Sequence, residues 1–148
     1  MHQRILVAMD DSPPSRAALA EAISLVKQAP GAAIRIVAAI ELPRPFAAAD
    51  GLDDESYEAR ARDDAAMLLE ETRTIARRDA VEPETAVVAC IEQPVAEALV
   101  EEAIAWGADV IVMGTHGRRG LARFFQGSVA ESVARIATVP VMLVTEEK

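Results

Sequence analysis

The chain has 148 residues, with 15 Lys and Arg against 24 Asp and Glu, and a formal net charge of −9. A single domain over residues 1–148 accounts for this length, since typical domains run about 100–150 residues. The hydrophobic share of 51% and the charged share of 26% are those of a folded globular protein and exclude a disordered chain. The acidic balance argues against nucleic-acid binding, which needs a basic face.

The apolar runs are too short for a membrane helix or a signal peptide. The longest, Ala86–Ile91, falls well below the roughly 20 residues of a membrane span and the roughly 7–15 of a signal-peptide core. We therefore expect no membrane anchor. Cys90 is the only cysteine, so no internal disulfide or cysteine zinc cluster is expected. The expected compartment is a reducing cytoplasm.

Short, largely β-branched apolar runs alternate with helical patterns along the chain. Five strands are predicted, at Ile5–Met9, Ile34–Ile40, Ala86–Ile91, Val110–Met113 and Val141–Val144. Because these runs are continuous rather than alternating with polar residues, they are typical of strands that are buried on both faces.

Four helices are predicted between the strands, each with one apolar stripe. The first is capped by Ser12, with Pro13 in its first turn. The second runs from about residue 53 to 79, with its acids on a solvated face and a buried stripe formed by Ala61, Ala65, Leu68, Thr72 and Ile75. The third opens at Pro94 and stops at Gly107. The fourth starts at Ser128, and its buried residues are Val129, Val133 and Ile136.

The resulting order, βαβαβαβαβ, predicts a five-stranded parallel sheet with right-handed crossovers and helices on both faces, a Rossmann-like α/β fold. Sheets of this kind bind ligands at the carboxyl ends of the strands, where the strand order reverses. That rule directs attention to three segments, which are Met9–Ser12, Ala39–Glu41 and Met113–Gly117.

The loop after the fourth strand combines glycines with positive charge. Between Val110 and Ala130 there is no acidic residue, whereas Arg118, Arg119 and Arg123 all lie here. Glycines let backbone N–H groups approach a phosphate closely, and a following helix N-terminus adds partial positive charge. The segment therefore reads as an anion site. A second interpretation, in which the glycines only turn the chain and a capping box of the S-x-x-E type starts the helix, is compatible with the first.

This segment resembles a known family. The spacing Gly114-x-x-Gly117, nine residues, then Gly127-Ser128 is similar to the G-2x-G-9x-G-S/T pattern of the ATP-binding branch of the universal stress protein family. The first strand with its Asp10–Ser12 turn and the last strand also resemble that family, so that the likeness covers essentially the whole chain. Asp11 departs from it, because relatives often carry glycine there.

The resemblance implies ATP at the strand ends, with or without Mg²⁺. It places Asp10 at the ribose or adenine, with Ala8 and Met9 as backbone partners and Ala39 or Ile40 beside the adenine. It lines the phosphate path with Met113, Gly114, His116 and Gly117, and holds the phosphates at Gly127, Ser128 and Val129. Arg118 would add positive charge for a triphosphate.

The resemblance also implies a homodimer through the last strand, whose residues are Val141, Met142, Leu143 and Val144. A short apolar edge strand invites pairing with a second chain, which agrees with this implication. A loop or the C-terminal tail covering that edge is the alternative.

Other functional classes are weaker. A phosphoacceptor receiver domain needs an aspartate after its third strand and a lysine after its fifth, whereas this chain has Glu92 and Glu146 there. No G-x-G-x-x-G follows a strand, and no Gly-Lys pair of a P-loop exists. A flavodoxin-like module remains open from topology, although aromatics make up only 3% of the chain.

Because no residue is an evident base for an attacking water, efficient catalysis is not expected. The favoured function is a cytoplasmic ATP-binding stress-response or signalling module that acts through dimerisation or partner binding. The alternatives are a slow Mg-dependent ATPase and a partner-binding module that does not use nucleotide.

Overall fold

The computed structural model describes residues 2–42, 54–115 and 127–146. Its elements, in chain order, are β1 (Arg4–Met9), α1 (Pro13–Gln28), β2 (Ala33–Leu42), α2 (Asp54–Arg78), β3 (Glu84–Ile91), α3 (Val95–Trp106), β4 (Val110–Thr115), α4 (Gly127–Ile136) and β5 (Val141–Thr145). Every predicted strand and helix is confirmed, with ends that shift by a few residues. Within the described ranges, no helix is long and apolar enough to cross a membrane.

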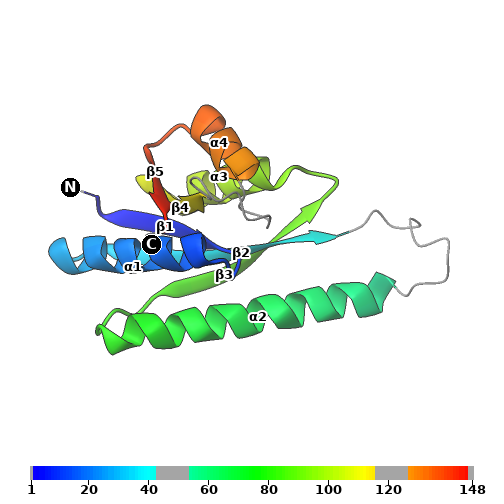
Figure 1. Cartoon of the computed structure of the whole chain (residues 1–148), viewed down its shortest axis with the longest axis horizontal. Coiled ribbons are helices and arrows are strands. Elements are labelled where there is room, and N and C mark those ends of the chain that lie inside the picture. The colour runs from blue at the N-terminus through cyan, green and yellow to red at the C-terminus, as the bar shows by residue number, and fades with distance from the viewer. Residues whose placement is uncertain (1, 43–53, 116–126, 147–148) are drawn as a thin grey trace.

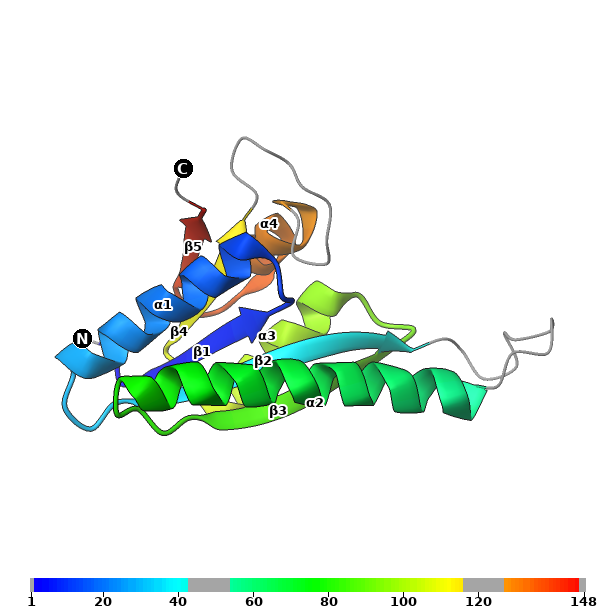
Figure 2. The same cartoon turned by 60° about the horizontal axis from the view of Figure 1, so that its bottom comes forward.

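The strands form one parallel sheet in the order β3-β2-β1-β4-β5. The central strand β1 pairs on one side with β2, where Ile5 lies opposite Ile34, and on the other side with β4, where Ile5 lies opposite Val110. Helices α1 and α2 cover one face of the sheet, and α3 and α4 cover the other (Figures 1 and 2). The strand order reverses between β1 and β4, which makes the carboxyl end of β1 the expected ligand side.

The core consists of two apolar layers, one on each face of the sheet. In β1, Ile5, Val7 and Met9 pack toward α1 and α2, while Leu6 and Ala8 pack toward α3 and α4. All of these side chains are buried almost completely. Burial on both faces explains the continuous apolar runs and confirms the expectation drawn from them.

The helices bury the predicted stripes with one exception. The Ser12 side chain accepts a hydrogen bond of 3.3 Å from the Ser15 N–H, which confirms it as the cap of α1. In α4 the prediction was wrong for Ile136, which is 38% exposed, whereas Ala130 and Val133 are fully buried. Ile136 is the last residue of this ten-residue helix, where the chain already turns away toward β5. The fully buried contacts of α4 therefore come from Ala130 and Val133, before its last turn reaches Ile136.

The amino-terminal end of the sheet is closed by side chains of β1, β3 and α3. The Arg4 guanidinium lies 4.2 Å from the centroid of the Trp106 ring and donates a 2.7 Å hydrogen bond to the Trp106 carbonyl. The indole N–H of Trp106 donates in turn to Glu84 at 3.2 Å. Trp106 therefore packs at the end of α3 and joins it to β1 and β3.

At the opposite end, β4 approaches α1 so closely that only glycine fits at position 114. A Cβ atom on Gly114 would lie 2.3 Å from the Pro14 carbonyl carbon, 2.4 Å from its oxygen and 2.6 Å from the Ser15 nitrogen. These are backbone atoms of the first turn of α1, so they cannot rotate away as a flexible side chain would. The missing side chain of Gly114 therefore sets the distance between β4 and α1.

We expect Gly114→Ala to lower the free energy of unfolding by about 2–3 kcal/mol, because the added methyl group must displace α1 from the sheet. Denaturant unfolding followed by circular dichroism measures this change. An alanine variant with the stability of the unchanged protein would contradict the close approach of the two elements.

Candidate functional site

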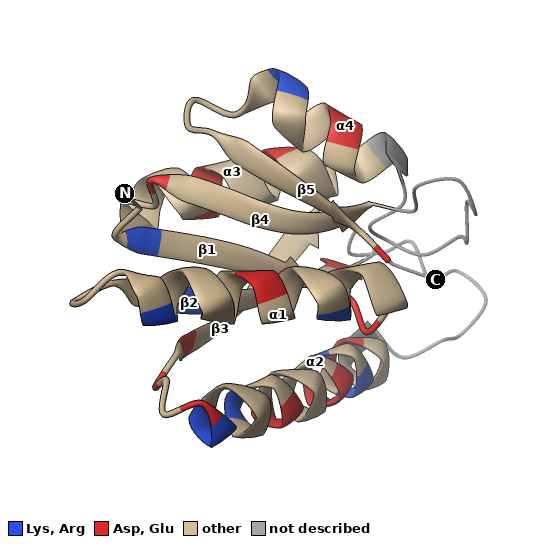
Figure 3. Ribbon diagram, turned by 60° about the vertical axis from the view of Figure 1, so that its left-hand side comes forward, with Lys and Arg blue, Asp and Glu red and all other residues tan. Residues whose placement is uncertain are grey.

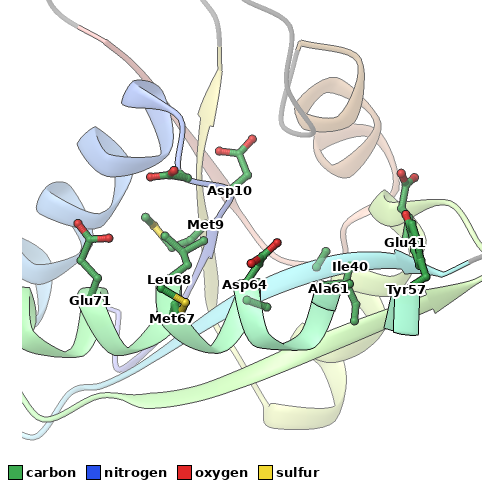
Figure 4. Close-up of a pocket in the computed structure, with 14 residues that line it drawn as sticks. Met9, Asp10, Ile40, Glu41, Tyr57, Ala61, Asp64, Met67, Leu68 and Glu71 are labelled. Carbon is green, nitrogen blue, oxygen red and sulfur yellow. The ribbon is translucent and has the colours of Figure 1, made fainter. Parts of the chain in front are cut away.

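A cavity of about 580 Å³ opens at the carboxyl ends of β1 and β2, underneath α2 (Figure 4). Its apolar wall comes from Met9, Ala38 and Ile40 on the strands and from Ala61 and Leu68 on α2. The cavity lies beside the point where the strand order reverses. This is the position that parallel α/β sheets use for ligands.

The structure brings four of the predicted site residues together at this cavity, and these are Met9, Asp10, Ala39 and Ile40. They come from two strands that are neighbours in the sheet but are separated in sequence by α1. Their meeting follows from the parallel pairing of β1 with β2, which aligns the two carboxyl ends.

Four other predicted residues lie away from the cavity wall. The side chains of Ala8 and Met113 are completely buried between the sheet and α3 and α4. Gly114 packs beneath α1, and the half-buried Val129 contacts the same core as Met113. Their side chains therefore have structural roles in this arrangement.

The remaining predicted residues belong to the glycine-rich segment. His116, Gly117 and Arg118 lie outside the described residues. Gly127 and Ser128 form the first turn of α4, which confirms that a helix begins at this motif. The amino-terminal end of α4 carries the partial positive charge of the helix dipole.

Asp10 is held in place by the turn that joins β1 to α1. Its Oδ1 accepts hydrogen bonds from the Ser12 N–H, at 3.0 Å, and from the Ser12 hydroxyl. The Asp10 N–H donates to the Ser15 hydroxyl oxygen at 3.3 Å. Because Ser12 itself caps α1, Asp10 supports the cap and at the same time presents its half-buried carboxylate at the cavity.

Asp11 occupies a backbone conformation that favours glycine, with φ at 72°. Its carboxylate pairs with the guanidinium of Arg16, which also bonds to both carboxylate oxygens of Glu71, at 3.0 and 3.2 Å. The hydrogen bonds that Arg16 donates to Glu71 and Asp11 raise the pKa of Arg16 above its ordinary value. Arg16 thus links the β1–α1 turn to α2 across one end of the cavity.

Sequence reasoning missed the contribution of α2, whose acids were expected on a solvated face. Asp64 and Glu71 are exposed, as expected, but they also line the cavity, together with Tyr57 and Met67. A signal was available, because Ala61, Asp64, Ala65 and Leu68 follow the i, i+3, i+4, i+7 spacing of one helix face. Asp64 therefore lies beside the buried stripe, where its exposed side chain borders the cavity.

The electrostatics of the wall suit a neutral group better than an anion. Among the described residues, every charged side chain of the wall is acidic, and these are Asp10, Asp11, Glu41, Asp64 and Glu71. Figure 3 shows acidic positions on the turn before α1 and along α2. Phosphate groups would be repelled here. In the part of the chain that the structure describes, no three side chains are grouped as metal ligands.

The fold and the cavity together define a parallel α/β protein with a cavity at the carboxyl ends of β1 and β2, next to the switch point of its sheet. Residues 1–145 match the universal stress protein family, and the chain belongs to that family.

Known relatives resemble the chain along its length. A universal stress protein of Methanocaldococcus jannaschii is 30% identical over 148 residues, which are all of this chain and 85% of that protein. A family member from Burkholderia pseudomallei has a crystal structure with a TM-score of 0.78 and 28% identity, covering 96% of this chain and 95% of that one. A universal stress protein crystallised in complex with cAMP has a TM-score of 0.69 and 28% identity, covering 99% of both chains.

The left-handed conformation of Asp11 predicts different stabilities for two variants. Asp11→Ala and Asp11→Gly both remove the ion pair with Arg16, but only glycine accepts the positive φ without strain. We expect the alanine variant to be about 1 kcal/mol less stable than the glycine variant, measured by denaturant unfolding. Equal stabilities would show that the backbone at this position is not strained.

Proposed function

We propose that this protein is a nucleotide-binding module of the ATP-binding branch of its family, built as one domain over the whole chain. ATP, with or without Mg²⁺, binds at the carboxyl ends of β1, β2 and β4. The nucleotide state then biases dimerisation or the docking of a partner in a cytoplasmic stress-response or signalling pathway.

The observation that carries this proposal is the coincidence of the cavity with Met9, Asp10, Ala39 and Ile40. The family resemblance of the sequence implied that these residues lie at the nucleoside end of the ligand. The apolar floor suits a purine ring, and the Asp10 carboxylate suits the hydroxyl groups of a ribose. The cAMP complex of a relative with 28% identity supports an adenine nucleotide as the ligand class.

Charge supports one orientation of the ligand. The wall of the cavity is acidic, whereas the segment between Gly114 and Ser128 contains three arginines and no acid. The charges therefore favour an uncharged nucleoside against the acidic wall of the cavity. The phosphates would then point toward the positive charge at the start of α4. Gly127 and Ser128 are then the phosphate-binding positions, with His116, Gly117 and Arg118 along the path.

We also propose a homodimer through β5. This strand pairs with β4 and lies at the edge of the sheet. Leu143, at its centre, is 40% exposed, and Val141, Met142 and Val144 are half-buried. A second copy that pairs along this edge would satisfy its open backbone groups and cover these side chains.

Filling the cavity is expected to abolish tight ATP binding. Ala61 lines the cavity from α2, so that Ala61→Phe places a phenyl ring in the space assigned to the base. We expect the affinity for ATP to fall by at least about tenfold, measured by calorimetric titration of nucleotide-free protein with and without Mg²⁺. Titration with AMP in parallel tests whether the triphosphate is preferred.

The matched control is Ala59→Phe, which adds the same ring to an exposed position of the same helix outside the cavity. This variant should bind ATP as the unchanged protein does. If the unchanged protein is folded and binds neither nucleotide, the proposed function is wrong. If both phenylalanine variants retain full affinity, the nucleotide binds elsewhere.

For the dimer, we expect Leu143→Glu to shift the protein toward the monomer, because a charge would be buried between two copies of β5. Light scattering coupled to size-exclusion chromatography measures the mass. The control is Ile104→Glu, at a position on α3 that is 59% exposed. A monomeric unchanged protein, or equal masses for all three proteins, would contradict this interface.

A further inference from the structure

Asp64 is an exposed acidic residue of α2 that lines the cavity. It borders the face of α2 that carries Ala61, Ala65 and Leu68, which pack against the core. Figure 4 shows its carboxylate rising from α2 into the space between Asp10 and Ile40. The side chain therefore faces the middle of the cavity, above the apolar floor.

Most of the other acidic residues that line the cavity already accept hydrogen bonds or form ion pairs within the protein. Asp10 accepts from Ser12, and Asp11 and Glu71 share Arg16. Asp64 makes no hydrogen bond or ion pair with any residue that the structure describes. Glu41 also lacks a described hydrogen-bond or ion-pair partner, but it stands at the far end of the cavity beside Tyr57 (Figure 4). The carboxylate of Asp64 is thus available to accept a hydrogen bond from a ligand in the centre of the cavity.

We propose that Asp64 determines base specificity by accepting a hydrogen bond from the exocyclic amino group of the purine. This inference rests on the proposed nucleotide binding and adds a residue of α2 to the site. An ionised carboxylate can only accept hydrogen bonds, so it favours a base edge that carries N–H donors. A purine without the amino group leaves the carboxylate unpaired against the ring.

The test compares ATP with purine riboside 5′-triphosphate, in which a hydrogen replaces the 6-amino group. The two probes carry the same phosphates and ribose, so that general charge effects of a substitution cancel in the ratio of their affinities. Calorimetric titration of the full chain gives both dissociation constants. We expect the unchanged protein to prefer ATP by about tenfold, the range of a hydrogen bond to a charged group.

Asp64→Ala should bring this preference close to one. The matched control is Asp63→Ala, which removes the same charge from the next position of α2, outside the cavity wall, and should keep the tenfold preference. Both substitutions place a good helix former on an exposed helix position, so that both variants should fold. Circular dichroism checks that they do.

The outcomes separate the two proposals. A protein that binds ATP but keeps its preference in Asp64→Ala, or that binds both triphosphates equally before substitution, overturns the role of Asp64 and leaves nucleotide binding intact. A folded protein that binds neither triphosphate overturns the proposed function itself, and the role of Asp64 with it. Loss of the preference in Asp64→Ala alone supports both.

Discussion

The burial of β1 on both faces is the constraint on which the rest of the structure depends. Its side chains from Ile5 to Met9 are enclosed by α1 and α2 on one face and by α3 and α4 on the other. Between Ile5 and Met9, a polar side chain would have to lose its hydration at a cost in free energy. The first position for polar chemistry is therefore Asp10, where the strand leaves the core.

The turn after β1 is stabilised by both backbone conformation and side-chain hydrogen bonds. Ser12 caps α1, Asp10 supports Ser12, and Asp11 accepts a left-handed backbone while pairing with Arg16. Most of these partners are near in sequence, so that the turn is largely a local structure. Glu71 is the exception, because its bond to Arg16 connects this turn to a helix 55 residues later. That contact joins the two walls of the cavity.

The two ends of the sheet carry opposite chemistry. At the amino-terminal end, Trp106 of α3 bonds to Arg4 of β1 and to Glu84 of β3, which joins the strands to α3. At the carboxyl-terminal end, the carboxylates of Asp64 and Glu41 have no described hydrogen-bond partner and surround an open cavity. Paired charges stabilise a fold, whereas unpaired acceptors beside an apolar floor are available to a ligand.

The sequence by itself determined the order of strands and helices, the parallel sheet and the cap at Ser12. These follow from hydrophobic periodicity and from hydrogen bonding in turns, which involve residues close together in sequence and can therefore be recognised from the sequence. It also indicated Met9, Asp10, Ala39 and Ile40, because the carboxyl ends of parallel strands share one edge.

Only the tertiary structure decided which residues complete the cavity. The place of Asp64 and Glu71 in the wall depends on how α2 lies across β2, and the requirement for glycine at position 114 depends on how closely α1 approaches β4. The exposure of Ile136 likewise depends on where α4 ends against its neighbours. Such contacts join segments that are far apart in sequence. Periodicity within one helix or strand predicts which face is buried, but it does not predict which other element packs against that face.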